Sequence, residues 1–283
     1  MSRKERFKDK VVVVTGASSG IGRATALEFA REGAKTVLVS RSGDKLEEVA
    51  DEIRSINSDV LVVPADVSVP EEVKGAIKKV LSTFGRIDVL FNNAGSSSVG
   101  AVEADDYIEK TKRMIDVDYF GTVYVTKEVL PVMRRQQSGH IMNMSSVVGK
   151  KAFPRFGGYS SAMHAITAFS DSLRQELRGS GIHVSTIHPA LTQTPLLGEV
   201  SQEDMPPPFR RLTPITPERV AKAVLDGIHS NQQRIVVPFQ PNMLLLADAL
   251  SPRLGDLVVR LLENRIFATL IGTYRGNVYE HNL

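Results

Sequence analysis

Residues 11–22 read VVVVTGASSGIG and combine the pattern of a buried strand with a glycine-rich turn. Four consecutive valines are typical of a strand that is buried on both faces, as in a parallel sheet. Gly16, Gly20 and Gly22 then permit backbone conformations and close approaches that a Cβ atom would forbid. The sequence RATALEFAREG follows, with apolar residues at helical spacing and Gly33 placed to end a helix.

A turn of this kind joins the end of a strand to the first N–H groups of a helix. These groups have no partner within the helix and point toward one place, which attracts a phosphate. Glycine-rich turns are common, but here the strand before and the helix after supply the context that the motif needs. The sequence therefore predicts a phosphate site at residues 16–22.

Strands and helices alternate along the rest of the chain. Alternation of this kind requires parallel pairing and right-handed crossovers. We therefore expect an α/β fold, a doubly wound (Rossmann) parallel seven-stranded sheet flanked by helices. The further strands are expected at 36–40, 60–64, 89–91, 140–144, 183–187 and 234–238, and the further helices at 44–55, 70–84, 106–135 and 159–178.

Composition excludes several classes of site. The sequence has no cysteine, so disulfides, thiolate catalysis and cysteine-ligated zinc are excluded. The formal net charge is only +3 with both signs interspersed, which favours a solvated surface over a nucleic-acid interface. His140, His183 and His188 have no acidic partner at ligand spacing, so we expect no metal site. The basic residues 1–10 lead directly into the first strand, which indicates a cytoplasmic protein.

Two segments lie outside the alternating pattern. We expect one dinucleotide-binding domain over residues 7–240 and a helical C-terminal extension over 241–283. Prolines break regular structure over about 195–217, where the chain leaves the sixth strand at the ligand-binding edge of the sheet. This segment is predicted to be a mobile lid over the substrate, with a plain surface loop as the alternative.

The C-terminal extension is amphipathic and rich in leucine. Charged residues interrupt its apolar runs well before the roughly 20 residues needed to span a bilayer. Burial against the domain or a second subunit is the simplest interpretation, and shallow contact with a membrane surface is the alternative.

Taken together, four features resemble the short-chain dehydrogenase/reductase family. They are TGASSGIG at 15–22, NNAG at 92–95, the pair Ser145 and Ser146, and Tyr159 thirteen residues after Ser146. They occur in the family's order and spacing, over about residues 7–238. The resemblance implies hydride transfer between a nicotinamide and a carbonyl or alcohol carbon. It also implies a homodimer or homotetramer that pairs through the helices beginning near Asp106 and Tyr159.

The resemblance also implies where the cofactor binds. The implied cofactor-binding residues are Gly16, Ser18, Ser19, Gly20, Ile21, Gly22, Ser40, Arg41, Asp66, Val67, Asn93, Ala94, Gly95, Tyr159, Pro189 and Thr194. An acidic residue at the end of the second strand would bind a ribose 2′-hydroxyl and repel a 2′-phosphate, whereas this chain has Ser40 and Arg41 there. Because a guanidinium is a good partner for phosphate, we predict NADP(H). The alternative is that Arg41 only caps the next helix.

By the same resemblance, four catalytic positions are Ser146, Tyr159, Asp118 and Met163. A serine positions the substrate oxygen, a tyrosine exchanges its proton, and Ser146 and Tyr159 match these roles. The family has a lysine four residues after the tyrosine, where this chain has Met163. It has an asparagine in the preceding long helix, where this chain has Asp118.

These two departures bear on the proton transfer. A phenol has a pKa of about 10, and a nearby cation is one of the few groups that bring it toward neutrality. Met163 has a similar reach to lysine but no charge, and Asp118, if ionised, would raise the pKa further. Losing a positioned proton-transfer group commonly costs on the order of 10² to 10⁴ in rate. His164 points away by about 100 degrees, and Lys150 or Lys151 reaching in from the loop after Ser146 is the minor alternative.

We therefore expect an NADP(H)-dependent oxidoreductase that is impaired by Met163. The alternative is a cofactor-binding protein without catalysis that acts as a sensor or interaction partner. A hydrophobic ketone, aldehyde or alcohol is the expected substrate, although the same apolar residues would also suit a core. The residues that flank the expected pocket are Val147, Val148, Phe153, Phe156, Leu191, Leu196 and Leu197.

Overall fold

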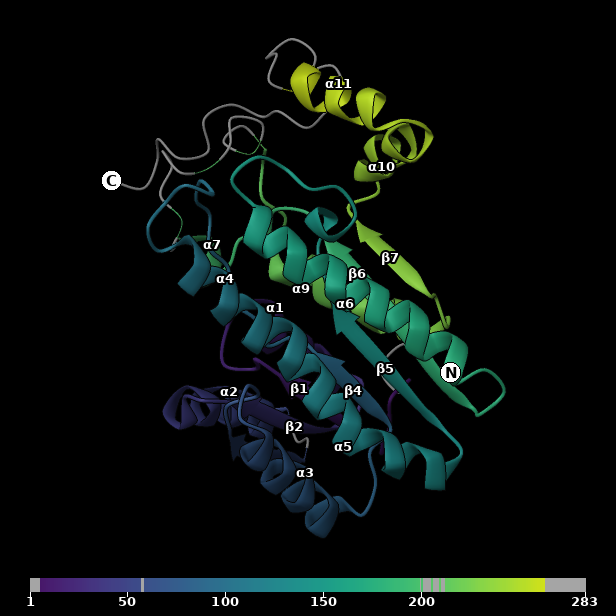
Figure 1. Cartoon of the computed structure of the whole chain (residues 1–283). Helices are drawn as coiled ribbons and strands as arrows, with labels where there is room; N and C mark the ends of the chain where they lie inside the picture. Colours follow the sequence, from purple (N-terminus) through teal and green to yellow (C-terminus); the bar gives the residue numbers. More distant parts are fainter. Residues whose placement is uncertain are drawn as a thin grey trace.

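A computed structural model describes residues 6–56, 59–198, 200, 205, 209 and 212–262 of the chain. Its centre is a seven-stranded parallel sheet in the order β3-β2-β1-β4-β5-β6-β7 (Figure 1). This confirms the predicted doubly wound sheet. The strands are β1 (Val11–Thr15), β2 (Lys35–Ser40), β3 (Val60–Pro64), β4 (Val89–Asn92), β5 (Gly139–Met144), β6 (Ile182–Pro189) and β7 (Arg234–Val237).

The valines of β1 explain why this strand is central. Val12 and Val14 lie in the apolar layer on one face of the sheet, and Val11 and Val13 lie in the layer on the other. All four are at most 1% exposed. Because successive side chains of a strand point to opposite faces, an uninterrupted valine run fits a strand that is covered on both sides.

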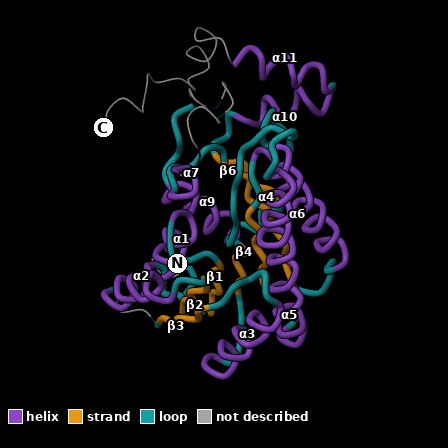
Figure 2. The backbone as a smooth tube through the Cα atoms, turned by 60° about the vertical axis from the view of Figure 1, so that its left-hand side comes forward, coloured by secondary structure: helices purple, strands orange, loops and turns teal. Residues whose placement is uncertain are grey.

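Helices cover both faces of the sheet, as Figure 2 shows. The first layer packs around Val12 and Val14, and the second around Val11 and Val13. Helices of the first layer are α1 (Gly20–Arg31), α2 (Gly43–Ser55) and α9 (Pro217–His229), and helices of the second are α3 (Pro70–Phe84), α5 (Gly121–Gln136) and α6 (Gly157–Glu176).

The long helix predicted over 106–135 is not continuous. It consists of α4 (Tyr107–Met114), a π-helical segment (Ile115–Phe120) and α5. A π-helical turn adds one residue to the turn, so the side chains that follow change face, and such turns are frequent at functional sites. Here the segment brings Asp118 into the interior, where it is 1% exposed.

Helix α9 was not predicted. It begins after Thr216, whose side chain accepts a hydrogen bond from the main-chain N of Arg219 at 3.3 Å. Pro217 occupies its first turn, a position that proline favours. The prolines between residues 198 and 217 predict irregular structure, and Pro217 was counted among them although it lies in the first turn of this helix.

The lid predicted over about residues 195–217 is described only in part. Residues 199, 201–204, 206–208, 210 and 211 lie outside the described residues. The short helix α7 (Pro195–Gly198) begins the segment. Farther along, the Phe209 ring lies 4.7 Å from the Phe153 ring and 5.1 Å from the Phe156 ring, measured between centroids. Lid motion stays a prediction.

Helices α10 (Pro241–Leu250) and α11 (Pro252–Leu262) confirm a helical segment after residue 240, and we call them the C-terminal hairpin. Residues 263–283 lie outside the described residues. The hairpin lies beyond the carboxyl end of β7 (Figure 1). Leu244 and Val259 are buried in an apolar cluster that also holds Phe153 and Phe156. The hairpin therefore packs against the loop that follows Ser146.

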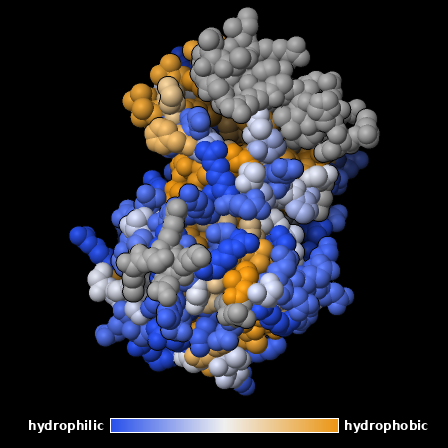
Figure 3. Space-filling view, turned by 180° about the vertical axis from the view of Figure 1, so that it is seen from behind, coloured by the Kyte–Doolittle hydropathy of each residue, from blue (hydrophilic) through white to orange (hydrophobic). Residues whose placement is uncertain are grey.

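The opposite side of the C-terminal hairpin is apolar and exposed. Figure 3 shows its hydrophobic side chains gathered at one end of the molecule. None of the helices in the described part of the chain is long and apolar enough to cross a membrane. The most exposed of its hydrophobic residues are Met243, Leu246, Leu250, Leu254 and Leu257.

Lys151 anchors the hairpin to the rest of the molecule. Its Nζ lies 2.7 Å from an Asp248 carboxylate oxygen in α10 and 2.8 Å from an Asp256 oxygen in α11. The Lys151 side chain is only 12% exposed, so water screens these pairs less than it screens pairs on the open surface.

We therefore expect Lys151→Ala to loosen the C-terminal hairpin locally, by about 1 kcal/mol, the upper range for partly exposed ion pairs. The measurement is hydrogen exchange of the backbone amides of residues 241–262. Lys222→Ala, which removes an exposed lysine of α9, is the control. Equal exchange in wild type and Lys151→Ala would contradict the anchoring role.

Candidate active site

The predicted site residues come together because parallel strands end at the same edge of the sheet. The segments that follow β1, β4, β5 and β6 meet there. Asn93 N and Ala94 N donate to Thr15 Oγ1 at 2.9 and 3.0 Å, which joins the end of β4 to the end of β1. Ser146 Oγ donates to the Pro189 carbonyl oxygen at 3.3 Å, which joins the ends of β5 and β6.

The glycine turn has the backbone geometry that its sequence predicts. Gly16 and Gly20 have φ angles of +65° and +53°, in the left-handed region that favours glycine. A Cβ on Gly22 would lie 2.2 Å from the carbonyl oxygen of Gly16, so only glycine fits there. The side chain of Ser19 makes no capping hydrogen bond, which leaves the first N–H groups of α1 available to an anion. The turn therefore fits a phosphate group.

A second corner of the site lies at the end of β2. The hydroxyl of Ser40 is buried and has no hydrogen-bond partner among the residues that the structure describes. Arg41 is largely exposed, and its guanidinium lies 4.0 Å from Asp66. Burial raises the pKa of Asp66, but hydrogen bonds from Ser68 and the charges of Arg41 and Arg113 outweigh it and hold the pKa below its usual value. An ionised carboxylate and a loosely held arginine thus lie side by side.

Ser146 lies between the end of β5 and the 3₁₀ turn Val147–Gly149. Its Oγ accepts a hydrogen bond from the main-chain N of Val148 at 3.3 Å, so the turn fixes its position. Tyr159 lies in the first turn of α6, and its hydroxyl interacts with the Ser146 side chain. The structure therefore brings the predicted serine and tyrosine together.

The pKa of Tyr159 is raised well above the usual value of a phenol. Burial is the main cause, and negative charge on Asp118 is the second. The hydrogen bond with Ser146 lowers the pKa without offsetting the other two effects. At neutral pH Tyr159 is protonated, which suits it to give a proton and not to take one.

Asp118 extends from the π-helical segment into the interior. Its Oδ1 accepts hydrogen bonds from the main-chain N of Ser96 at 2.7 Å and from Ser96 Oγ at 3.2 Å. Burial raises the pKa of this carboxyl to about 8, against the lowering effect of the two Ser96 hydrogen bonds. The position of Asp118 was predicted from the sequence, whereas its burial was not, and burial keeps most of the carboxyl uncharged at neutral pH.

Met163 is buried one helical turn after Tyr159. It belongs to the same apolar cluster as Phe153 and Phe156. A Cβ on Gly149 would lie 2.8 Å from the Met163 Cβ, so the helix and the loop after Ser146 are in close contact here. Met163 therefore places an apolar side chain beside the tyrosine.

The other cationic residues near the site do not supply a positive charge to Tyr159 in place of a lysine at position 163. Lys151 pairs with Asp248 and Asp256. Burial and the charge of Arg234 lower the pKa of Lys150. His164 is exposed, and its Nδ1 lies 2.8 Å from the carbonyl oxygen of Ser160. Within the described part of the chain, no Lys, Arg or His lowers the pKa of Tyr159.

The apolar residues expected around the pocket are divided between core and rim. Leu191, Leu196 and Leu197 are only partly buried, so they remain candidates to contact a substrate. Val147, Val148, Phe153 and Phe156 are buried. Residues of the same cluster that sequence reasoning missed are Met205, Phe209, Leu244 and Val259. These residues lie far from Tyr159 in the sequence, so no local pattern predicted that they would pack near it.

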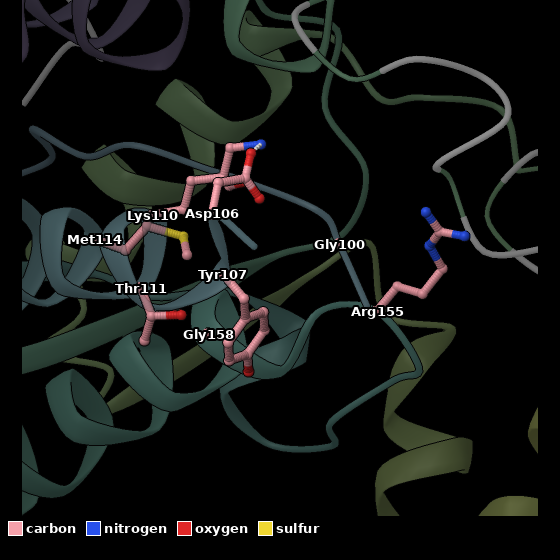
Figure 4. A pocket seen from close by; sticks show the side chains of 9 residues that line it. Gly100, Asp106, Tyr107, Lys110, Thr111, Met114, Arg155 and Gly158 are labelled. Carbon is pink, nitrogen blue, oxygen red and sulfur yellow. Dashed lines mark ion pairs between the residues drawn. The ribbon is translucent and has the colours of Figure 1, made fainter. Parts of the chain in front are cut away.

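A small pocket adjoins the site on the side of α4, and sequence reasoning missed it as well. Figure 4 shows its side chains around the start of α6, with the ion pair of Lys110 and Asp106 at 2.6 Å. Gly158 lines this pocket and directly precedes Tyr159 in the chain. The lining residues are Ser98, Gly100, Asp106, Tyr107, Lys110, Thr111, Met114, Arg155 and Gly158.

Two histidines in the strands, His140 and His188, make hydrogen bonds that hold neighbouring segments together. His140 Nε2 lies 2.8 Å from Ser185 Oγ, and His188 Nδ1 lies 3.1 Å from the carbonyl oxygen of Ser146. Burial, with the charge of His183, lowers the pKa of His140 to about 3, and burial, with the charge of Lys150, lowers that of His188 to about 4. The described residues include no group of three acidic or histidine side chains arranged for a metal. The expectation of no metal site stays a prediction.

Comparison with known proteins assigns the family. The family model described as short chain dehydrogenase matches residues 10–205. An uncharacterized oxidoreductase of Staphylococcus saprophyticus is 38% identical over 241 residues, which are 82% of this chain and 95% of the relative.

Two solved structures share the fold. The L-sorbose reductase of Gluconobacter frateurii, complexed with NADPH and L-sorbose, has a TM-score of 0.73 and 29% identity, and covers 82% of this chain and 95% of its own. A 3-ketoacyl-(acyl-carrier-protein) reductase from Brucella melitensis, complexed with NADH, has a TM-score of 0.73 and 27% identity, and covers 81% of this chain and 97% of its own. This chain therefore belongs to the short chain dehydrogenase family of oxidoreductases.

Proposed function

We propose that the chain is an NADP(H)-dependent oxidoreductase that acts on a hydrophobic ketone or aldehyde, or on the corresponding alcohol, with turnover limited by Met163. The observation that carries the proposal is the pair Ser146 and Tyr159 at the carboxyl edge of the sheet, next to the glycine turn. The alternative, a silent NADP(H)-binding sensor, is favoured by the apolar surroundings of Tyr159 and is separated from the first proposal by the experiments below.

The glycine turn and the end of β2 supply the cofactor contacts. The first N–H groups of α1 would hold the pyrophosphate, and Arg41 with the unpartnered hydroxyl of Ser40 would hold the 2′-phosphate. Bound NADP(H) supplies or accepts the hydride. Asp66 and Val67 would contact the adenine, and the backbone of 93–95 would contact the nicotinamide half together with Pro189 and Thr194. Thr194 lies beside the glycine turn, since its Cγ2 would be 3.1 Å from a Cβ on Gly20, which supports its place in the cofactor site.

Ser146 and Tyr159 supply the chemistry on the substrate. Ser146 donates a hydrogen bond to the carbonyl oxygen, and Tyr159 gives that oxygen a proton as the carbon is reduced. Among the residues that the structure describes, no cation stabilises the phenolate that remains, so proton transfer from Tyr159 is costly in this site. Leu191, Leu196 and Leu197 form the apolar wall for the substrate.

Domain division, assembly and location complete the proposal. Residues 7–240 form the catalytic domain with its lid, and residues 241–283 form the extension. Two or four copies pair through α4, α5 and α6 into a homodimer or homotetramer. The exposed face of the C-terminal hairpin contacts a second subunit, with weak contact to a membrane surface as the alternative. The location is cytoplasmic.

Cofactor choice is tested with Arg41→Ala. We expect this variant to bind NADPH about 10- to 100-fold more weakly, the cost of one charge-assisted hydrogen bond, and to bind NADH unchanged. Isothermal titration with both nucleotides measures the two affinities. Arg31→Ala removes an exposed arginine at the opposite end of α1 and is the control. Equal loss for both nucleotides would show that Arg41 does not read the 2′-phosphate.

Catalysis is tested with Met163→Lys and with Met163→Lys combined with Asp118→Asn. A lysine one turn after Tyr159 lowers the phenol's pKa, and we expect NADPH oxidation with hydrophobic ketones to rise about 100-fold or more. The double variant removes the carboxyl that would otherwise pair with the new lysine, so its gain should be larger. Met163→Leu changes the side-chain shape without adding charge and should not give the gain.

Three outcomes separate the candidate functions. A gain in the lysine variants supports the impaired oxidoreductase. Substantial turnover that is equal in wild type and Met163→Lys would contradict the role given to Met163. Tight NADPH binding without turnover in any variant, over a broad panel of carbonyl compounds, would favour the sensor.

A further inference from the structure

The carboxyl group of Asp118 has an unequal set of hydrogen bonds. Both donors from Ser96 reach Oδ1, whereas Oδ2 is buried and has no partner among the residues that the structure describes. A buried carboxylate needs donors on both oxygens, because each carries part of the charge. A carboxylic acid accepts on its carbonyl oxygen and carries its own proton on the other. The contacts of Asp118 fit the acid with the proton on Oδ2, because a buried O–H without a partner costs far less than a buried charged oxygen without one.

The elements packed against Asp118 bring no positive charge to it. The loop after β4 contributes Ser96, and α6 contributes the phenol of Tyr159. Asp116, two residues earlier in the π-helical segment, is exposed. Across the described residues, burial and the Ser96 hydrogen bonds are the only effects that shift the pKa of Asp118, to about 8.

The charge of Asp118 decides what Tyr159 can do. When Tyr159 gives its proton to a carbonyl oxygen, a phenolate forms in a site that has Met163 where a cation would help. An anionic carboxylate beside the phenolate would oppose this step, whereas an uncharged acid would not. Alcohol oxidation passes through the same phenolate, so the charge of Asp118 bears on both directions of the reaction.

We propose that Asp118 serves this site as an uncharged carboxylic acid, so that no anion opposes the phenolate that forms when Tyr159 gives its proton to a carbonyl oxygen. In the reaction, hydride from NADPH reduces the carbonyl carbon and the cofactor is oxidised. The Tyr159 O–H bond breaks, its proton goes to the carbonyl oxygen, and the phenolate regains a proton from water. Asp118 is a positioning residue that acts through Tyr159. The effect on Tyr159 rests on the proposed function, while the charge of Asp118 does not.

The charge of Asp118 is measured by infrared spectroscopy of the full chain without cofactor. At neutral pH we expect the C=O band of a protonated carboxylic acid in wild type and in Asp116→Asn, and its absence in Asp118→Asn. On titration the band should disappear with a midpoint near pH 8. Asp116→Asn is the matched control, since it removes an exposed carboxyl from the same segment. If no band at neutral pH depended on Asp118, the proposal would be overturned.

Stability gives a second readout that needs no turnover. The folded state keeps a proton on Asp118 up to about pH 8, whereas the unfolded chain loses it near pH ~4. Between these values the folded state binds more protons, so wild-type stability falls as pH rises through the window. Asp118→Asn has no such loss, and its melting temperature should exceed that of wild type by a margin that grows from acid to about pH 8. A margin that is constant with pH would contradict an uncharged Asp118.

The effect of the Asp118 charge on Tyr159 is tested separately, by the pH dependence of carbonyl reduction. We expect wild type to reduce carbonyl compounds below the ionisation of Asp118 and to lose rate above it, with no matching loss in Asp118→Asn. A loss of rate that is equal in wild type and Asp118→Asn would overturn the effect assigned to the charge of Asp118. If no variant turns over any substrate, the proposed function fails and the effect on Tyr159 fails with it, while the infrared band still decides the charge of Asp118.

Discussion

Parallel pairing of β1 with its neighbours is the constraint on which the site depends. Because all strands run the same way, the ends of β1, β4, β5 and β6 lie at one edge, and segments far apart in sequence meet there. Thr15 illustrates the result, since its hydroxyl accepts from the main chain of Asn93 and Ala94. The valine run of β1 makes this arrangement stable, because it is buried from both faces.

Within that edge, charge separates two halves of the candidate site. The cofactor half has an open helix N-terminus and an exposed arginine, and both suit phosphate groups. The half around Tyr159 is apolar, because Met163 lies in the apolar cluster that also holds Phe153 and Phe156. A phenol in such surroundings keeps its proton. The site therefore favours binding of a phosphate-containing cofactor but disfavours ionisation of Tyr159.

The sequence predicted the parts of this structure that depend on local pattern. Valine runs, the glycine turn and the alternation of elements have short-range signatures, and the strands lie where these indicate. Ser146 and Tyr159 were found because their spacing resembles that of a family. Asp118 shows the limit, since its position was visible but its burial depends on a π-helical segment and on Ser96, twenty-two residues away. The packing of Lys151 and Phe209 was hidden for the same reason, because both have partners distant in sequence.

The central claim is that Tyr159 ionises only at high pH because it is buried and no cation among the described residues lies beside it. The most direct test is a spectroscopic titration of that tyrosine. Subtracting the tyrosinate absorbance of Tyr159→Phe from that of wild type isolates its ionisation. The account predicts that Tyr159 remains protonated beyond about pH 10, where an ordinary phenol is half ionised. Ionisation of Tyr159 near neutral pH would contradict the account, because another group would then be stabilising the phenolate.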